Sequence, residues 1–362
     1  MNAFPRCPLL PTLLLASLPL IHLPAAYAAS GCKIINGPGP ATFTANFNDV
    51  WVPRDLPVGE PISHLRVPVV DDPGNRVVEC HNSADRLLEA HADYTTPFAH
   101  DVPVRLGNGR FANRVIRTRI PGVGAVVELD HPFNGGAPNT FTPSTVSTLL
   151  PYSGTNMTSM GTPIKIGPIS MSVTLVKIGS IAAGPITLDE EVARGSTSDV
   201  ADAFRLRISG NLNQAQCMLK NGAVSPAPVD LGSHTVADFP GKGTTLPNPG
   251  VPFHITLSEC QDDPMSSTAT AYIYLTGTDG SVALDPKQGL FSLGNGSTAK
   301  GIGIQITDES GNPVPLAEHV STNKKLELPN TRLSYRAHFY QTDDRVGPGV
   351  AKGALDFTIS YR

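Results

Sequence analysis

The sequence predicts an all-β protein made of two immunoglobulin-like β-sandwich domains. Three features predict it: frequent turn formers, short runs of alternating apolar and polar residues, and two well-separated cysteine pairs. Glycine and proline each occur 34 times, and long helix-forming tracts are missing. Many short strands joined by turns, with one disulfide in each half, are typical of sandwich folds.

The first residues have the pattern of an export signal. An apolar run from Leu9 to Leu23 ends in Ala26-Tyr27-Ala28, the small-x-small pattern that signal peptidase accepts. Prolines interrupt the run, and it is too short to span a bilayer comfortably. We therefore predict a signal peptide over residues 1–29.

Four cysteines remain once Cys7 leaves with the signal peptide: Cys32, Cys80, Cys217 and Cys260. They form two pairs of similar spacing, so the simplest interpretation is one disulfide per domain, Cys32 with Cys80 and Cys217 with Cys260. Each closed loop stabilises its domain by about 4 kcal/mol if chain entropy dominates. The alternative is a four-cysteine metal site, which the lack of any Cys-x-x-Cys pair disfavours.

Turn formers and charge suggest where the domains meet. Turn sequences are dense over residues 30–188, which we interpret as the first domain. Residues 189–203 are the most polar stretch in the chain and are the predicted linker. The second domain then covers residues 204–362. Its last strand is the clearest one, because Leu355, Phe357, Ile359 and Tyr361 share one face and polar residues occupy the other.

Four features of the second domain occur in a fixed order along the chain. They are Cys217 followed by Val229-Asp230-Leu231-Gly232 and the run Phe253–Cys260, then Gly301–Asp308, then Tyr335–Tyr340, and finally the strand that ends in Tyr361 and Arg362. Together they resemble the pilin domain of chaperone–usher fimbrial subunits. The resemblance implies an incomplete, six-stranded sandwich, which lacks its seventh strand and leaves a hydrophobic groove open.

The resemblance also implies how the groove is used. A periplasmic chaperone fills it first, and the amino-terminal extension of an adjacent fimbrial subunit replaces the chaperone at the outer-membrane usher. The expected contacts on the last strand and just before it are Gly349, Leu355, Phe357, Ile359 and Tyr361. An apolar strand edge left unfilled is an aggregation hazard, which explains the need for a chaperone.

The start of the mature chain points to one end of the fimbria. Cys32 follows the predicted cleavage site almost at once, so its disulfide anchors the chain start inside the first domain. No free donor strand is then expected. A subunit that accepts a strand but donates none terminates the polymer, which predicts a position at the tip of a fimbria on the bacterial cell surface, reached through the periplasm.

The first domain resembles a fimbrial adhesin domain. Pro121-Gly122-Val123-Gly124 is similar to a glycine motif of such adhesins, and Cys80-His81-Asn82 resembles the end of the disulfide-bearing strand in the mannose-binding type 1 adhesin. Sugar sites combine an aromatic platform with Asn or Asp side chains that bond hydroxyls. The predicted ligand-binding residues are therefore Asn82, Asp93, Tyr94 and Trp51.

These observations favour a fimbrial tip adhesin that binds a host-cell glycan or glycoprotein. The alternative is a structural adaptor or assembly-initiating minor subunit that binds no glycan. A secreted hydrolase is disfavoured because Ser297-Thr298-Ala299-Lys300 is an isolated Ser-x-x-Lys without partner motifs. The net charge of −4 and the lack of a basic cluster argue against nucleic acid. We expect no catalytic residues, no cofactor and no metal.

Overall fold

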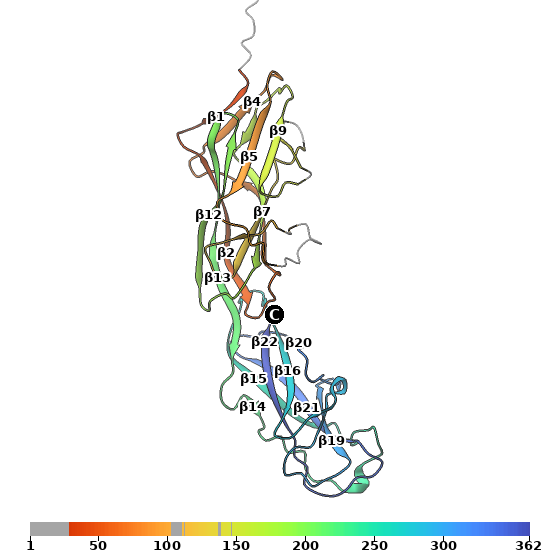
Figure 1. Cartoon of the computed structure of the whole chain (residues 1–362). Helices are drawn as coiled ribbons and strands as arrows, with labels where there is room; N and C mark the ends of the chain where they lie inside the picture. Colours follow the sequence, from red (N-terminus) through yellow and green to blue (C-terminus); the bar gives the residue numbers. More distant parts are fainter. Residues whose placement is uncertain (1–28, 103–110, 112, 137–138, 146) are drawn as a thin grey trace, which may run out of the picture.

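The computed structural model describes residues 29–102, 111, 113–136, 139–145 and 147–362. The predicted signal peptide lies outside this part of the chain, apart from its last residue. The described secondary structure is almost entirely β-strand, which confirms the all-β prediction. Figure 1 shows an elongated molecule with two bodies arranged end to end.

In its described residues the first body has thirteen strands: β1 (Gly31–Ile35), β2 (Ala41–Pro53), β3 (Pro61–Val70), β4 (Val77–His81), β5 (Leu88–Tyr94), β6 (Ile116–Arg117), β7 (Val123–Leu129), β8 (Thr142–Pro143), β9 (Tyr152–Asn156), β10 (Ile164–Ile166), β11 (Ile169–Lys177), β12 (Ile186–Thr197) and β13 (Val200–Met218). They form the sheets β1-β4-β10, β3-β11-β7-β6 and β13-β12-β5-β9-β8, and β2 pairs in parallel with β13.

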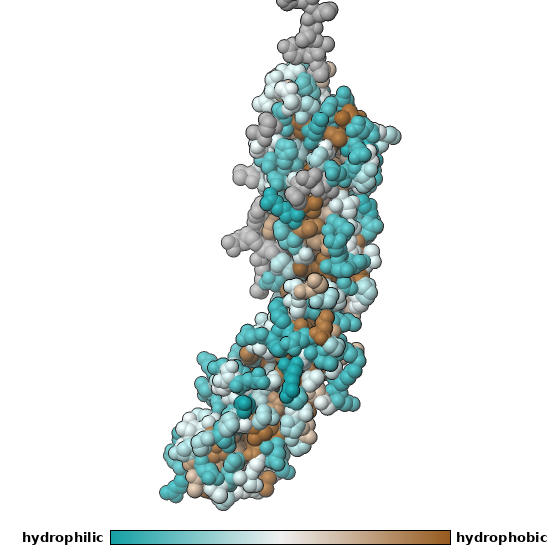
Figure 2. All heavy atoms as spheres, turned by 180° about the vertical axis from the view of Figure 1, so that it is seen from behind, coloured by the Kyte–Doolittle hydropathy of each residue, from teal (hydrophilic) through white to brown (hydrophobic). Residues whose placement is uncertain are grey.

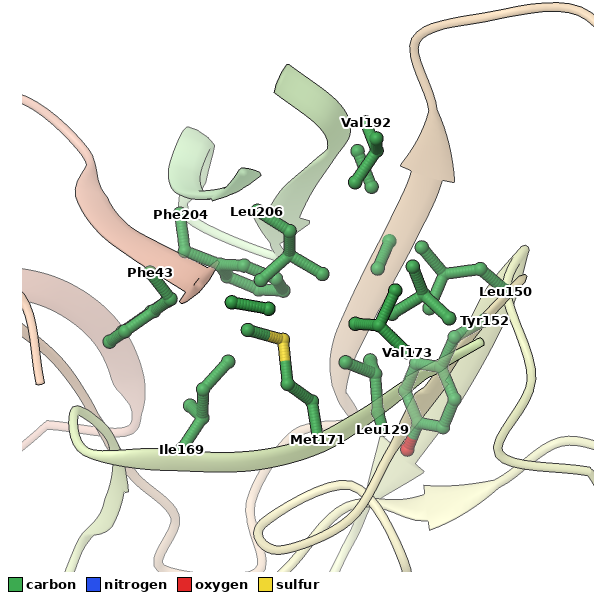
Figure 3. Packing of buried hydrophobic residues seen from close by; sticks show 14 of the residues in the cluster. Phe43, Leu129, Leu150, Tyr152, Ile169, Met171, Val173, Val192, Phe204 and Leu206 are labelled. Carbon is green, nitrogen blue, oxygen red and sulfur yellow. The ribbon is translucent and has the colours of Figure 1, made fainter. Parts of the chain in front are cut away.

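The inward faces of these sheets share one hydrophobic core. Phe204 lies near its centre, with ring centroids 5.5 Å from Phe133 and 6.5 Å from Phe43. Met171 and Val173, from β11, point into the same space (Figure 3). Alternate residues are buried along the first half of β2 and of β11, as expected for strands with one face on a core. The second half of β11 is buried at every residue.

The predicted linker over residues 189–203 is wrong. This stretch forms most of β12, the turn after it and the start of β13. The two strands pair as a hairpin, and β12 also pairs with β5. Val192 and Ala203 are fully buried in the first core. A Cβ on Gly195 would lie 2.0 Å from the Phe204 ring, so the hairpin packs closely on itself there.

The charge that suggested a linker belongs to the outer face of this hairpin. Four ion pairs cover that face: Asp189 with Arg207, Glu191 with both Arg194 and Arg205, and Asp202 with Arg205. A register shift between Glu191 and Ala193 interrupts the strict alternation of polar and apolar residues. The stretch therefore contains a strand, although its sequence lacks the regular alternation of polar and apolar residues by which strands are recognised.

The second body contains β14 (Val224–Ser225), β15 (Val251–Gln261), β16 (Thr270–Thr278), β17 (Ala283–Asp285), β18 (Leu290–Ser292), β19 (Ile302–Asp308), β20 (Val320–Lys325), β21 (Thr331–Gln341) and β22 (Ala354–Tyr361). Two 3₁₀ turns, η2 (Val236–Asp238) and η3 (Pro286–Gln288), lie between strands. One sheet has the order β17-β18-β19-β21-β15 and the facing sheet has the order β20-β16-β22.

The boundary between the two bodies falls within β13. Leu212 is buried in the first core, whereas Ala215 and Cys217 are buried in the second. We therefore call residues 29–214 the first unit and residues 215–362 the second unit. Each unit has one disulfide, paired as predicted: Cys32 with Cys80, and Cys217 with Cys260.

A buried carboxylate fixes the turn before β4. Asp72 is 3% exposed and accepts hydrogen bonds from the main-chain N–H of Thr42 (2.8 Å) and from Arg76 Nε (2.9 Å) and Nη2 (2.7 Å). Burial raises the pKa of Asp72, but the hydrogen bonds from Arg76 and Thr42 outweigh it and lower the pKa to about 2. The ionised form is thus stabilised in the folded state.

We expect Asp72→Asn to lower the free energy of unfolding of the first unit at pH 7 by about 2 kcal/mol. The folded-state pKa lies below the ordinary value of 3.8, so the stabilisation is present above that value and is lost as the pH falls toward 2. The loss in Asp72→Asn should therefore shrink on acidification. Denaturant unfolding at pH 7 and pH 3 checks this, and Asp71→Asn, at an exposed neighbour, is the control that should change nothing.

Candidate functional site: an apolar groove beside the last strand

The last strand, β22, is paired on one side only. It pairs with β16 in antiparallel register, and no described strand pairs with its other side. Arg362 and Thr270 exchange both main-chain hydrogen bonds, at 3.0 and 2.6 Å. Since hydrogen-bonded positions alternate in an antiparallel pair, Leu355, Phe357 and Ile359 direct their N–H and C=O groups toward the open side.

An apolar groove of about 290 Å³ lies beside this open edge. Its walls come from both sheets and from the segment that follows β14, and it reaches down to the second core. The lining residues are Val224, Pro228, Val229, Leu231, Phe253, Ile255, Ile273, Leu275, Phe291, Ile304, Ile306, Tyr335, Ala337, Gly353, Ala354, Leu355 and Phe357. None of them is charged. Figure 2 shows apolar atoms exposed between polar ones on the second unit.

The five residues predicted as groove contacts have different positions. Leu355 and Phe357 line the groove. Ile359 and Tyr361 are 4% and 1% exposed and belong to the packed core. Gly349 lines an adjacent hollow of about 400 Å³. The apolar face of β22 is thus open along its first half and covered along its second.

A close approach explains the glycine at position 349. A Cβ on Gly349 would lie 2.5 Å from the main-chain nitrogen of Ala299 and equally close to the hydroxyl of Thr298. The Thr298 hydroxyl also accepts a hydrogen bond from the N–H of Val350, at 2.8 Å. Only glycine fits without moving this backbone.

This geometry is suited to binding an extended strand. The open main-chain groups of β22 supply hydrogen bonds, and an apolar groove accepts alternate side chains of the bound strand. Burial and the nearby Asp308 raise the pKa of Tyr335, which lines the groove. Because its lining holds no charged side chain, the groove is suited to uncharged, apolar side chains.

The predicted sugar-binding residues do not form one site. Asn82 is fully buried; its Nδ2 donates to the carbonyls of Arg86 (2.9 Å) and Asn156 (3.0 Å), and its Oδ1 accepts from the N–H of Ala84 (2.9 Å). These bonds satisfy the side chain inside the protein. Its role in this structure is to hold the end of β4 and the following turn.

The other three lie elsewhere along the first unit. The Tyr94 hydroxyl accepts from the N–H of Val127 at 3.0 Å, and burial raises its pKa, so this side chain belongs to the core. Asp93 is exposed on β5, which places it on the outer face of the sheet. Trp51, at the end of β2, packs against the core of the second unit.

The part of the chain that the structure describes shows no group of three or more His, Cys, Asp or Glu side chains that could hold a metal ion. Within the same residues, no helix is both long and apolar enough to cross a membrane.

The sequence matches the family described as Fimbrial protein over residues 206–362. The fimbrial-like protein YdeS of Escherichia coli (strain K12) is 30% identical over 161 residues, which cover 43% of this chain and 85% of that protein. The fimbrial subunit type 1 of Salmonella typhimurium is 28% identical over 192 residues, covering 53% and 97% of the two chains. Among solved structures, the CupB6 tip adhesin from Pseudomonas aeruginosa aligns with 92% of this chain and 95% of its own, at 15% identity and a TM-score of 0.35. The chain therefore belongs to the fimbrial protein family.

Proposed function

We propose that this chain is the tip adhesin of a chaperone–usher fimbria. The second unit joins it to the fimbria by accepting a strand in the groove beside β22. The first unit attaches the bacterium to a host-cell glycan or glycoprotein. The observation that carries the proposal is the arrangement of the chain: an open, strand-accepting fimbrial unit is preceded by a separate β unit with its own core. On this proposal the chain catalyses no reaction.

Two kinds of partner use the groove in turn. A periplasmic chaperone fills it during export, and a strand from an adjacent subunit replaces the chaperone at the outer-membrane usher. The uncharged lining of the groove and the open main-chain groups of Leu355 and Phe357 support this exchange, because any inserted strand needs backbone partners and an apolar groove.

The position of β1 supports the tip location. Residues Gly31–Ile35 pair with β4 along their whole length, and Cys32 is bonded to Cys80 within that pair. The main-chain N–H of Cys32 also donates to Asp199, at 2.8 Å, on the turn between β12 and β13. This segment is part of the first unit and is not free to complete the groove of another subunit.

We place the contact surface at the end of the first unit farthest from the second. Leu88 pairs with Asn156, so Leu87 and Met157 lie opposite each other just beyond the paired strands. Both side chains are exposed, at 46% and 57%. The hydrogen bonds between Glu89 and Ser198 tie this end to the β12–β13 turn, about 40 Å along β13 from the junction of the units.

A fimbrial adaptor that binds no glycan is the second candidate. It is favoured by one observation: Asn82 and Tyr94 are satisfied inside the fold and Trp51 lies at the junction, so the adhesin-like residues do not converge. An array of host glycans, probed with the full chain stabilised by a donor strand, separates the two candidates. Binding that the Leu87→Ala/Met157→Ala pair abolishes, and that Met265→Ala preserves, supports the adhesin; Met265 is 91% exposed on the second unit. No binding to any glycan or host cell supports the adaptor.

We expect Phe357→Asp to abolish capture of the chain by its chaperone, because a carboxylate would replace an apolar side chain in an uncharged groove. Thr358→Asp is the matched control, since Thr358 is exposed on the opposite face of the same strand. Co-purification of the chaperone from the periplasm measures capture. Equal capture of the two variants would show that the groove is not the chaperone site.

A further inference from the structure

The open edge of β22 ends at a segment of the first unit. The main-chain N–H of Asp55 donates to the carbonyl of Tyr361, at 2.9 Å, and the N–H of Tyr361 donates to Asp55 Oδ2, at 2.8 Å. These two hydrogen bonds satisfy the outward main-chain groups of Tyr361 as a neighbouring strand would. One residue of the first unit thus takes the pairing position at the end of the edge.

Arg54 extends this contact along the strand. Its guanidinium lies 4.9 Å from the centroid of the Tyr361 ring, and Nη2 donates to the carbonyl of Ile359 at 3.3 Å. The same guanidinium bonds the carboxylate of Asp55, at 3.1–3.3 Å, and so orients it. Among the described residues, the outward groups left open on β22 are therefore those of Leu355 and Phe357 and the N–H of Ile359.

Further hydrogen bonds hold Arg54 and Asp55 in place. The N–H of Arg54 donates to the carbonyl of Ala215 at 3.1 Å, and Lys177 Nζ donates to the carbonyl of Arg54 at 2.8 Å. On the other side, the Tyr361 hydroxyl donates to the carbonyl of Cys217 at 3.1 Å. Both partners of the contact are thus fixed to β13, the strand that the two units share.

We propose that Arg54 and Asp55 form a register stop for the strand that enters the groove. This inference rests on the proposed function of the groove and adds where the bound strand must end. A neighbouring subunit's strand pairs with Leu355 and Phe357, ends opposite Ile359, and cannot pair with Tyr361. The partner is thus an extended segment of limited length, whose apolar residues are placed by the first unit as well as by the groove.

The test uses the full chain and synthetic peptides in which valine alternates with threonine between terminal lysines. One peptide has about nine residues, a typical upper length for a strand. A second peptide has two more residues at its amino end, and a third has two more residues at its carboxyl end. Residue-resolved amide exchange shows which amides of β22 each peptide slows and therefore which lengthened end points toward Tyr361. Titration gives the Kd of each peptide.

In the wild-type chain we expect the peptide to slow exchange at Leu355 and Phe357, and lengthening toward Tyr361 to leave the Kd unchanged. In Asp55→Ala the same lengthening should tighten binding by up to about tenfold, the equivalent of roughly 1.4 kcal/mol, because the N–H of Tyr361 loses its acceptor. The Tyr361 carbonyl stays bonded to the main-chain N–H of residue 55 in this variant. Asp55→Asn, which keeps a side-chain oxygen as acceptor, should behave as the wild type.

Three outcomes are distinguishable. If the peptide lengthened toward Tyr361 binds the wild-type chain more tightly, the register stop is overturned and the groove function stays intact. This measurement uses only the wild-type chain, so it does not depend on the folding of a variant. A Kd in Asp55→Ala that does not respond to length overturns the part of the Asp55 carboxylate in the register stop. A peptide that slows neither Leu355 nor Phe357 in any chain overturns both the register stop and the proposed use of the groove.

Discussion

Supplying a donor strand should raise the free energy of unfolding of the second unit by several kcal/mol. Each apolar side chain that the strand buries in the groove beside Leu355 and Phe357 contributes about 1.5–3 kcal/mol, less the entropy of ordering the strand. A few such side chains approach the 5–15 kcal/mol that stabilises a typical domain. Calorimetry of the full chain, with and without a donor segment fused after Arg362 through a flexible linker, measures the gain as a shift of the second unit's melting transition.

The same fusion should rescue the protein in the periplasm when its chaperone is absent. The matched control replaces the apolar residues of the fused segment with serine and keeps its length, so it tests groove filling and not tethering. The first unit has a separate core, and its melting transition should not move. A second unit that melts cooperatively at one temperature in all three proteins would contradict the expectation.

The sequence predicted the second unit well because its signals are local. Alternation over Leu355, Phe357, Ile359 and Tyr361 identifies a strand with one apolar face, and this strand is β22. What alternation does not reveal is which part of that face is covered. Tyr361 is buried because residues far away in sequence, Asp55 and Cys217, reach it. Contacts between residues so far apart in sequence produce no regular pattern of polar and apolar residues.

The first unit shows where local signals mislead. The charged stretch at residues 189–203 has the composition of a linker, yet its charges pair across the outer face of a hairpin whose inner face is apolar. Asn82 ends the motif Cys80-His81-Asn82, on which the sugar-binding prediction was based, yet the fold turns its amide inward to Asn156. Composition and short motifs report residue types, whereas pairing partners decide which face a residue occupies.

The corrected boundary leads to a prediction with an equally large effect. A fragment of residues 30–188 should be unfolded, and a fragment of residues 30–214 should fold and melt cooperatively. The shorter fragment loses the side chains that the β12–β13 hairpin places in the first core, namely Val192, Ala193, Ala203, Phe204, Leu206, Ile208 and Leu212.

The size of the effect follows from burial and from pairing. Burying each of the larger apolar side chains is worth about 1.5–3 kcal/mol, so their combined loss is comparable to the whole stability of a typical domain. The shorter fragment also leaves β2 without β13, its pairing partner, and β5 without β12. Circular dichroism and thermal melting of the two fragments decide the matter. A cooperative transition in the shorter fragment would show that the hairpin is dispensable, and the first unit would then end near Leu188 after all.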